Sequence, residues 1–218
     1  MDAIIAEVSR NFEGLLLIFI RVSALLYASP VFGRKAIPAM AKAGLCAFIA
    51  YIVFGAYTIP VIRYAGLWHY AMLCILELMF GVALGYITTL FFSVAQTAGH
   101  AIDMQMGFGM VNVFDVQSNI SVPMSGNFLN IILLIAFFGA GGHRQLIAIL
   151  LATFNTVPPG QVAISAAAGA AALKFFCLAF VMALNVAMPI IASGLLGELI
   201  MGFVVRTVPQ MNIFVVGI

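Results

Sequence analysis

Charged residues are scarce in this chain. Lys, Arg, Asp and Glu make up 7% of its 218 residues, whereas apolar residues make up 65%. Soluble domains carry about 25% charged residues, so a soluble domain of this composition would lack a polar surface. We therefore interpret the chain as an integral membrane protein. The net charge of +2 and the lack of a basic stripe in the sequence exclude a nucleic-acid-binding protein.

Cysteine is also rare. Cys46, Cys74 and Cys177 lie far apart, each inside an apolar run. No pair has the spacing of a metal site or a redox motif, so we expect buried free thiols and neither a metal nor a cofactor. We do not expect a cleavable signal peptide, because Asp2 and Glu7 precede the first apolar run and no basic segment does.

Seven apolar segments are candidates for membrane helices, for which a full span needs roughly 20 residues. They cover residues 12–28, 43–62, 78–98, 128–138, 146–157, 163–184 and 189–205. The segments 128–138 and 146–157 are each about half a span long, and we interpret them as a bent hairpin. Half-helices need neighbouring protein to satisfy their ends. The sequence therefore predicts an all-α membrane protein of bent helical hairpins, packed in a larger assembly.

The basic residues predict the orientation of the first helices. The first eleven residues contain two acids and one base, whereas Arg34, Lys35 and Lys42 follow the first apolar segment. The positive-inside rule then places the loop from Arg34 to Lys42 in the cytoplasm and the N-terminus outside. The chain ends at Ile218 inside an apolar run, which we interpret as truncation of a longer protein.

The stretch from Gln105 to Asp115 is the most unusual part of the sequence. It combines two glycines, an asparagine and an aspartate between apolar segments, although lipid can neither satisfy irregular backbone nor solvate a carboxylate. It must therefore pack inside protein or line a cavity. Flexible methionines around it suit a deformable seal, although they also fit ordinary apolar filling. We expect these residues to plug and gate a pore: Met106, Gly107, Phe108, Gly109, Met110, Val111, Asn112, Val113, Phe114 and Asp115.

Four ionisable residues lie inside apolar segments or at their ends: Arg21, Glu77, Lys174 and Glu198. Each would cost roughly 2.5–3.5 kcal/mol at the centre of a membrane helix. They can form a proton or ion pathway, or they can form ion pairs between helices of this chain or with partner chains. Equal numbers of acids and bases favour pairing and a role in assembly.

Two further patterns concern helix faces. His100 and Asp103 are three residues apart and share one face, but a catalytic zinc needs three protein ligands, so we favour a satisfied polar patch. Gly81 and Gly85 form a small-xxx-small pair that lets another helix approach closely.

Several motifs appear together in a fixed order along the chain. They are Arg21, Pro30, Ile37-Pro38, Lys42, Ala98-Gly99, Gln105-Met106-Gly107, Phe114-Asp115, Gly142-His143 and Val208-Pro209-Gln210-Met211-Asn212-Ile213-Phe214-Val215-Val216-Gly217. This pattern resembles the FliR family of flagellar export-gate subunits and their counterparts in virulence type III secretion. The chain departs from that pattern at His100, where the family commonly has glutamate, and at Val116, where it commonly has proline.

The resemblance implies a non-enzymatic subunit of the flagellar type III export gate, in the bacterial inner membrane at the flagellar basal body. FliP and FliQ would join it in a hetero-oligomer, FlhB and FlhA would lie at the cytoplasmic side, and unfolded proteins would be exported. One domain, 1–218, would contain a FliP-like portion (1–188) and the start of a FliQ-like hairpin (189–218). The family's plug loop corresponds to residues 107–122.

Two other classes of function were compared with this interpretation. A polytopic small-molecule or ion transporter also uses broken helices and isolated acids, but the sequence has no two matched halves. An intramembrane hydrolase is disfavoured, because the chain has neither a Gly-x-Ser-x-Gly nor a His-Glu-x-x-His motif.

Overall fold

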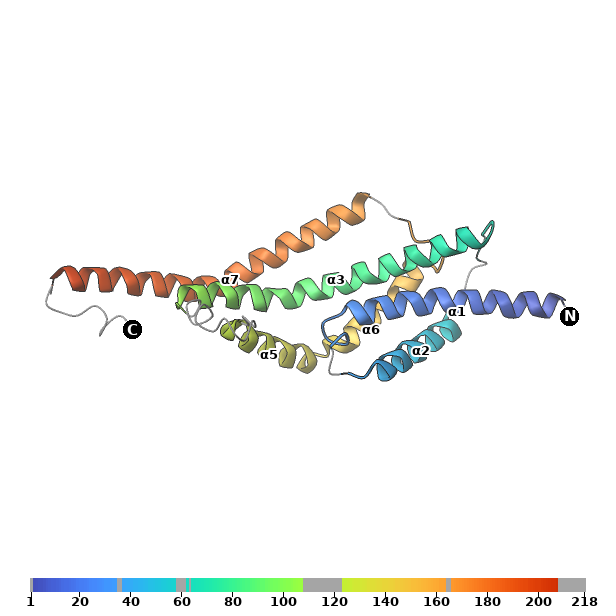
Figure 1. Ribbon diagram of the computed structural model, residues 1–218, viewed down its shortest axis with the longest axis horizontal. Helices are drawn as coiled ribbons and strands as arrows, with labels where there is room; N and C mark the ends of the chain where they lie inside the picture. Colours follow the sequence, from blue (N-terminus) through green and yellow to red (C-terminus); the bar gives the residue numbers. More distant parts are fainter. Residues whose placement is uncertain are drawn as a thin grey trace, which may run out of the picture. The chain divides into compact units, whose positions relative to one another are not determined.

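The computed structural model describes residues 2–34, 37–57, 62, 64–107, 123–163 and 166–207, with side chains from Phe12 onward (Figure 1). Within these ranges all regular secondary structure is helical, which confirms the predicted all-α fold. The helices are α1 (Asp2–Ala28), α2 (Ala39–Ala56), α3 (Leu67–Gln105), α5 (Met124–Gly139), α6 (Gly142–Thr156) and α7 (Ala166–Thr207).

Three of the described helices, α2, α3 and α7, are long and apolar enough to cross a membrane. Helices α5 and α6 together meet the same criteria, but the chain bends by 67° between them. Gly141 makes this bend with a left-handed backbone (φ 72°), which glycine adopts without a steric penalty. The predicted bent hairpin is thus confirmed.

The segments 163–184 and 189–205, predicted as separate helices, are one helix. Helix α7 runs for 42 residues with Pro189 inside it, about 63 Å at the helical rise per residue. Proline removes one backbone donor, but membrane helices tolerate it where neighbouring groups satisfy the freed carbonyl. Helix α3 is also longer than predicted, with 39 residues. Both exceed the bilayer's hydrocarbon core of about 30 Å.

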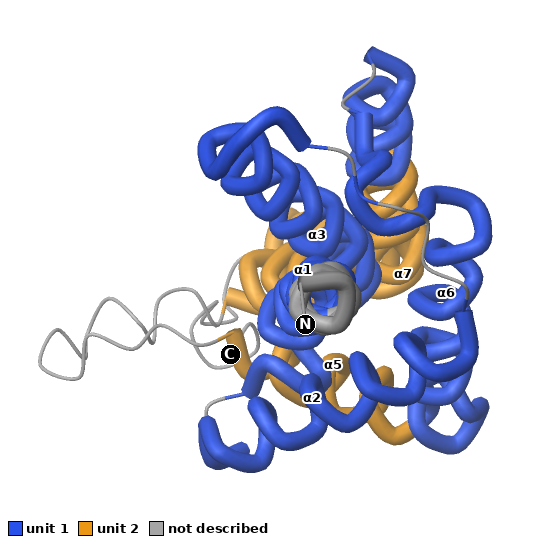
Figure 2. Tube along the Cα trace, turned by 90° about the vertical axis from the view of Figure 1, so that its right-hand side faces the viewer, with its two compact units in different colours: residues 1–92, 136–176 blue, residues 93–135, 177–218 orange. Residues whose placement is uncertain are grey.

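The chain divides into two compact units (Figure 2). Unit 1 contains residues 1–92 and 136–176, and unit 2 contains residues 93–135 and 177–218. Helices α3, α5 and α7 each contribute residues to both. The division into FliP-like and FliQ-like portions at residue 189 stays a prediction.

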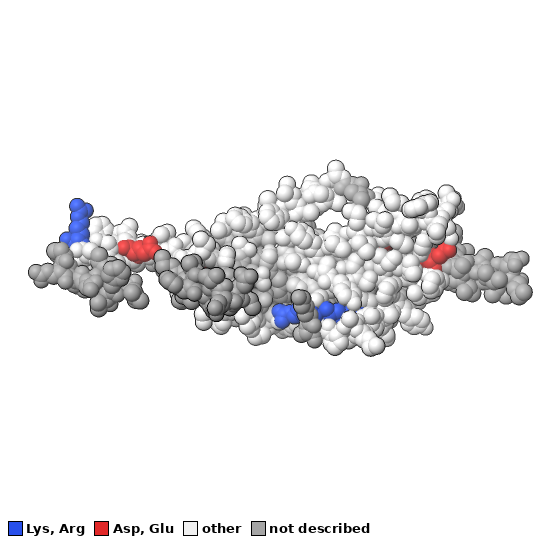
Figure 3. Space-filling model, viewed as in Figure 1, with Lys and Arg blue, Asp and Glu red and all other residues white. Residues whose placement is uncertain are grey.

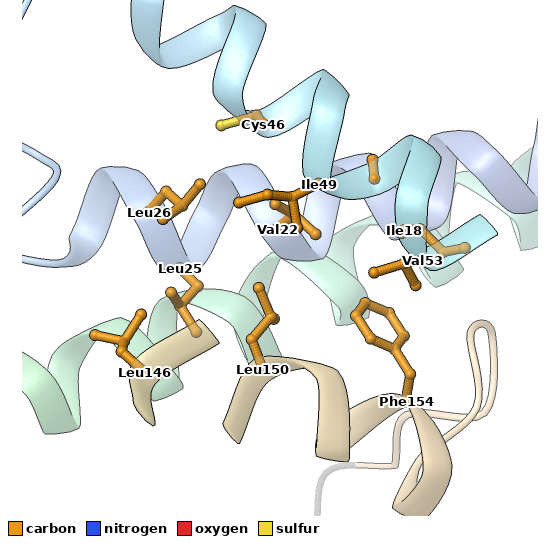
Figure 4. Packing of buried hydrophobic residues seen from close by; sticks show 11 residues of the cluster. Ile18, Val22, Leu25, Leu26, Cys46, Ile49, Val53, Leu146, Leu150 and Phe154 are labelled. Atoms are coloured by element: carbon orange, nitrogen blue, oxygen red, sulfur yellow. The ribbon is translucent and has the colours of Figure 1, made fainter. Parts of the chain in front are cut away.

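Unit 1 has a core of large apolar side chains. Figure 4 shows three helices directing side chains toward one another. They are Ile18, Val22, Leu25 and Leu26 from α1, Cys46, Ile49, Ala50 and Val53 from α2, and Leu146, Leu150 and Phe154 from α6. Spacings of three and four residues place each set on one helix face. Of the three free cysteines expected to be buried, Cys46 is buried, Cys74 is partly buried and Cys177 is exposed on α7. Burial is thus wrong for Cys177, which lies on an apolar face of α7 that the described residues leave exposed.

Helices α1 and α3 of unit 1 touch at backbone distance. A Cβ atom added to Gly81 would lie 2.5 Å from the carbonyl oxygen of Arg21 and 2.6 Å from Cβ of Ala24. One turn on, a Cβ at Gly85 would overlap Cβ of Ala28. The close approach predicted from the two glycines is confirmed, and it brings Arg21 onto the face of α3.

Unit 2 is held by small residues. Its core cluster contains Ala98 and Ile102 from α3 and Ala183 and Ala187 from α7. Gly99 of α3 lies against α5, so that an added Cβ would be 2.7 Å from the carbonyl carbon of Ser125. Among the described residues, Ile102 is the largest buried member of this cluster, and the partly buried Val94, Ala101, Leu129 and Ile191 pack against it.

Candidate functional site

Arg21 and Glu77 are the most deeply buried charged residues among the described side chains. Arg21 lies on the face of α1 that meets α3, and it is 0% exposed. Its Nε donates to Oε2 of Glu77 at 2.6 Å, and its Nη2 donates to Oε1 at 3.0 Å. Glu77, on α3, is equally buried. This bidentate geometry is the strong form of an arginine–carboxylate pair.

The pair also holds the end of α6. Nη1 of Arg21 donates to the carbonyl oxygen of Val157 at 2.8 Å and to that of Thr153 at 3.5 Å. The carbonyl of Val157, the C-cap residue of α6, has no partner within the helix, whereas that of Thr153 also accepts the N–H of Val157. A cation at this end of a helix is favourable. Oε1 of Glu77 accepts a further bond from the backbone N–H of Gly160 at 2.8 Å. The charges therefore fasten α6 and the turn after it to α1 and α3.

Two aromatic rings complete the cluster. The guanidinium carbon of Arg21 lies 4.9 Å from the ring centre of Phe80 and 4.5 Å from that of Phe154, within cation–π range. In the described part of the chain, no group of three His, Cys, Asp or Glu could hold a metal ion. The cluster can fix the geometry of four segments, and the described residues offer it no second carboxylate to receive a proton.

A second polar contact lies near the N-terminal half of α1. The hydroxyl of Tyr64 donates to the Glu13 carboxylate at 2.5 Å, and the hydroxyl of Tyr70 donates to the Glu13 carbonyl oxygen at 3.0 Å. The bond to the Glu13 carboxylate raises the pKa of the Tyr64 phenol, because it favours the protonated form. Glu13 of α1 therefore binds both the segment before α3, through Tyr64, and the first turn of α3, through Tyr70.

In unit 2, a carboxylate joins the helices on either side of the predicted plug. Asp103, in the last turn of α3, is 5% exposed. It accepts the backbone N–H of Ser125, which lies 3.1 Å from Oδ1 and 3.2 Å from Oδ2. Ser125 is in the first turn of α5, where backbone donors lack helical partners. Asp103 therefore caps α5 from another helix, and His100, its exposed neighbour in sequence, is not its bonded partner.

The end of α3 is also tied to α7. Nε2 of Gln105 donates to Oε1 of Glu198 at 3.0 Å. A Cβ added to Gly194, one helical turn before Glu198, would lie 3.0 Å from Cγ of Gln105. The glycine therefore leaves room for the glutamine side chain to reach its partner.

The predicted plug residues are only partly described. Met106 and Gly107 follow α3 and are exposed, and Gly107 has a left-handed backbone (φ 76°). Residues Phe108, Gly109, Met110, Val111, Asn112, Val113, Phe114 and Asp115 lie outside the described residues.

The four predicted buried charges have three different environments. Arg21 and Glu77 lie together, Glu198 bonds an amide, and Lys174 is exposed on α7 without an ion-pair partner among the described residues. Figure 3 shows how few charged groups reach one face of the molecule. A role for these four residues in assembly stays a prediction.

Sequence reasoning missed Asp103 as a helix cap and Gly160 as a ligand of Glu77. The Pro158-Pro159-Gly160 sequence indicated the end of α6, but it did not indicate that the N–H of Gly160 binds Glu77. The sequence around Asp103 does not indicate a helix cap, because the residue that it caps, Ser125, is 22 positions away.

Comparison with known proteins identifies the family of the chain. The family model described as "Bacterial export proteins, family 1" matches residues 12–218. The chain is 33% identical over 210 residues to the flagellar biosynthetic protein FliR of Bacillus subtilis (strain 168), covering 95% of this chain and 81% of that protein. It is 31% identical over 201 residues to the FliR of Escherichia coli (strain K12), covering 91% and 76%. The FliR of Pectobacterium carotovorum subsp. carotovorum is 34% identical over 202 residues, with the same coverage. The chain belongs to the FliR family of bacterial export proteins.

Proposed function

We propose that this chain is a non-enzymatic subunit of a flagellar protein export gate in the bacterial inner membrane, at the basal body. The observation that carries the proposal is the family match over residues 12–218. FliP and FliQ subunits are its proposed partners in a hetero-oligomer, with FlhB and FlhA at the cytoplasmic side. Unfolded flagellar proteins are the proposed cargo, and no covalent chemistry is involved.

The exposed apolar surface supports an assembled state. Helix α7 leaves large side chains such as Phe180, Leu196 and Phe203 more than half exposed in the single chain. Exposed apolar area of this extent needs lipid or another chain to cover it. A subunit packed among partner helices meets that need along a 42-residue helix better than a solitary molecule does.

We further propose that residues 107–122 close the central channel at rest. Two features of the flanking helices support this role. Asp103 holds the start of α5 against the end of α3, so both ends of the segment are anchored close together. Glu198 holds Gln105, two residues before Gly107. A segment anchored in this way can yield to cargo while its ends stay in place.

Deleting residues 110–120 tests the plug. The assembled complex is expected to leak ions, measured as membrane conductance in cells and in reconstituted bilayers. Replacing the same residues with a Gly-Ser segment of equal length controls for chain length and should leak as well. Unchanged conductance of a correctly assembled deletion complex would reject the plug while leaving the subunit assignment intact.

Gentle purification of the tagged chain tests the subunit assignment separately. FliP and FliQ should accompany it in several copies. A lone homodimer would contradict the gate and favour the small-molecule transporter.

A further inference from the structure

Unit 1 contains an apolar groove between α1, α2 and α3. Its volume is about 630 Å³, within the range of roughly 300–1,000 Å³ that small-molecule sites occupy. The lining side chains are almost all apolar: Phe19, Ser23, Ala24, Tyr27, Ala28, Ala43, Cys46, Leu78 and Val82. The groove suits a flexible hydrocarbon chain, because few of these residues could orient a polar ligand.

The walls of the groove are fixed, so it cannot simply collapse. Ala24 and Ala28 lie against Gly81 and Gly85, where no room remains for the helices to approach further. Cys46 is fully buried in the core that joins α1, α2 and α6. Tight packing on these two sides keeps the space between the helices open.

One end of the groove is basic and aromatic. Tyr27, 49% exposed, lies beneath the Lys42 ammonium, whose nitrogen is 5.5 Å from the centre of its ring. The same ammonium donates to the carbonyl oxygen of Gly33 at 3.0 Å, which places it beside the exposed Arg34. Aromatic and basic side chains in this combination are typical of the membrane–water interface.

Among the side chains that the structure describes, no acid balances this end of the groove. The sequence contains no Asp or Glu between Glu13 and Glu77. Glu77 is paired with Arg21, and Glu13 binds Tyr64 about 21 Å along α1 from Tyr27 at the helical rise per residue. The basic end therefore has a net attraction for an anion.

We propose that this groove binds an anionic phospholipid, with one acyl chain between α1, α2 and α3 and the phosphate beside Lys42 and Arg34. The apolar groove and its basic end both favour this ligand. The apolar walls favour a hydrocarbon chain, and the unbalanced bases favour an anionic over a zwitterionic headgroup. An apolar helix of a partner chain would fill the groove, but it would bring no anionic group to the basic end. The inference is independent of the proposed plug.

The test uses the full-length chain, in the complex that it forms, purified in mild detergent. Phosphatidylglycerol with a photoreactive diazirine on its acyl chain is added, cross-linked by light and located by peptide mass spectrometry. Cross-links are expected around Leu78 and Val82. Unlabelled phosphatidylglycerol should compete for the site better than phosphatidylcholine does.

Variants separate the two parts of the site. Each basic residue near an anionic membrane surface contributes about 1 kcal/mol, so Lys42→Gln should weaken competition by phosphatidylglycerol about fivefold and leave phosphatidylcholine unaffected. Lys42→Arg should keep the preference, and Arg206→Gln, on α7, is the control for loss of a basic residue. Ala43→Phe should fill the groove and remove the cross-links with both lipids, while circular dichroism and elution volume check that it folds.

Three results would overturn the proposal. The two lipids could compete equally, or Ala43→Phe could leave the cross-links unchanged. A photoreactive amino acid at position 78 could also cross-link to a partner protein and never to lipid, which would identify the groove as a helix-docking site.

Discussion

The helices of the two compact units are held together by different kinds of side chain. Unit 1 interlocks large apolar residues such as Leu25, Leu150 and Phe154, and it buries a complete ion pair at Arg21 and Glu77. The core cluster of unit 2 is built on alanines, Ile102 and helix approach at Gly99. Among the described residues of unit 2, the deeply buried carboxylate is that of Asp103, and it binds a backbone N–H instead of a base.

This difference shows how each unit can stay folded where water is absent. Apolar burial gives little drive for helix association in lipid, because lipid tails are as apolar as leucine. The stability of helix association in lipid therefore depends on close packing and on polar contacts. Unit 1 depends on charges that join four segments. Unit 2 depends on backbone proximity and on a cap between helices. The variants below test that contrast, from the largest expected effect to the smallest.

Removing one charge of unit 1 should cause the largest loss. Arg21→Leu leaves the Glu77 carboxylate buried without its partner, and breaking a buried pair in this way costs about 3–5 kcal/mol. We expect a lower thermal unfolding temperature in detergent and a lower yield of assembled complex. Arg206→Leu, which removes an exposed arginine from α7, is the matched control.

The double variant Arg21→Leu with Glu77→Leu sharpens this prediction. It removes both charges, so it should recover part of the lost stability. Normal yield and normal unfolding temperature of the single variant would show that unit 1 does not depend on its ion pair.

A methyl group at the tightest contact of unit 2 should have the next largest effect. In Gly99→Ala, the new Cβ would overlap the backbone of Gly126, and overpacking of this kind costs about 1–3 kcal/mol. Gly197→Ala is the control, because its Cβ would meet nothing within 4 Å. Thermal unfolding of both variants in the same detergent measures the difference. Equal stability of the two would mean that backbone proximity does not hold unit 2.

Loss of the cap between helices should have the smallest effect of the three. Asp103→Ala leaves the Ser125 N–H without its acceptor, and loss of a helix cap costs about 0.5–2 kcal/mol. Faster hydrogen exchange confined to the first turn of α5 is the expected readout. Ser125→Ala keeps the backbone donor and should stay within about 0.5 kcal/mol of the parent. Equal hydrogen-exchange rates in the first turn of α5 for Asp103→Ala and Ser125→Ala would show that the cap does not stabilise α5.

Much of the helical architecture could be predicted from residue patterns. Gly81 and Gly85 indicated a close helix approach, and α1 and α3 meet there. The half-span lengths of the segments 128–138 and 146–157 indicated the bent pair α5 and α6. Pro189 misled the prediction, because a proline that ends a helix in water can stay inside a long helix whose neighbours satisfy its backbone.

The candidate site was less predictable than the helices. The sequence identified four charges in apolar segments: Arg21, Glu77, Lys174 and Glu198. Their spacing did not indicate that Arg21 would pair with Glu77. The acceptors of Arg21 on α6 and the Gly160 donor are backbone groups, which leave no mark in a sequence.

By itself, the sequence determined that this chain is a helical membrane protein of the FliR type, because sparse charge, apolar runs and ordered motifs are local properties that need no partner. Only the tertiary structure decided which charges meet, which carboxylate caps which helix and where a groove remains open. Those outcomes depend on residues 22 to 136 positions apart coming within bonding distance. Such distances are set by packing between helices and not by the order of neighbouring residues.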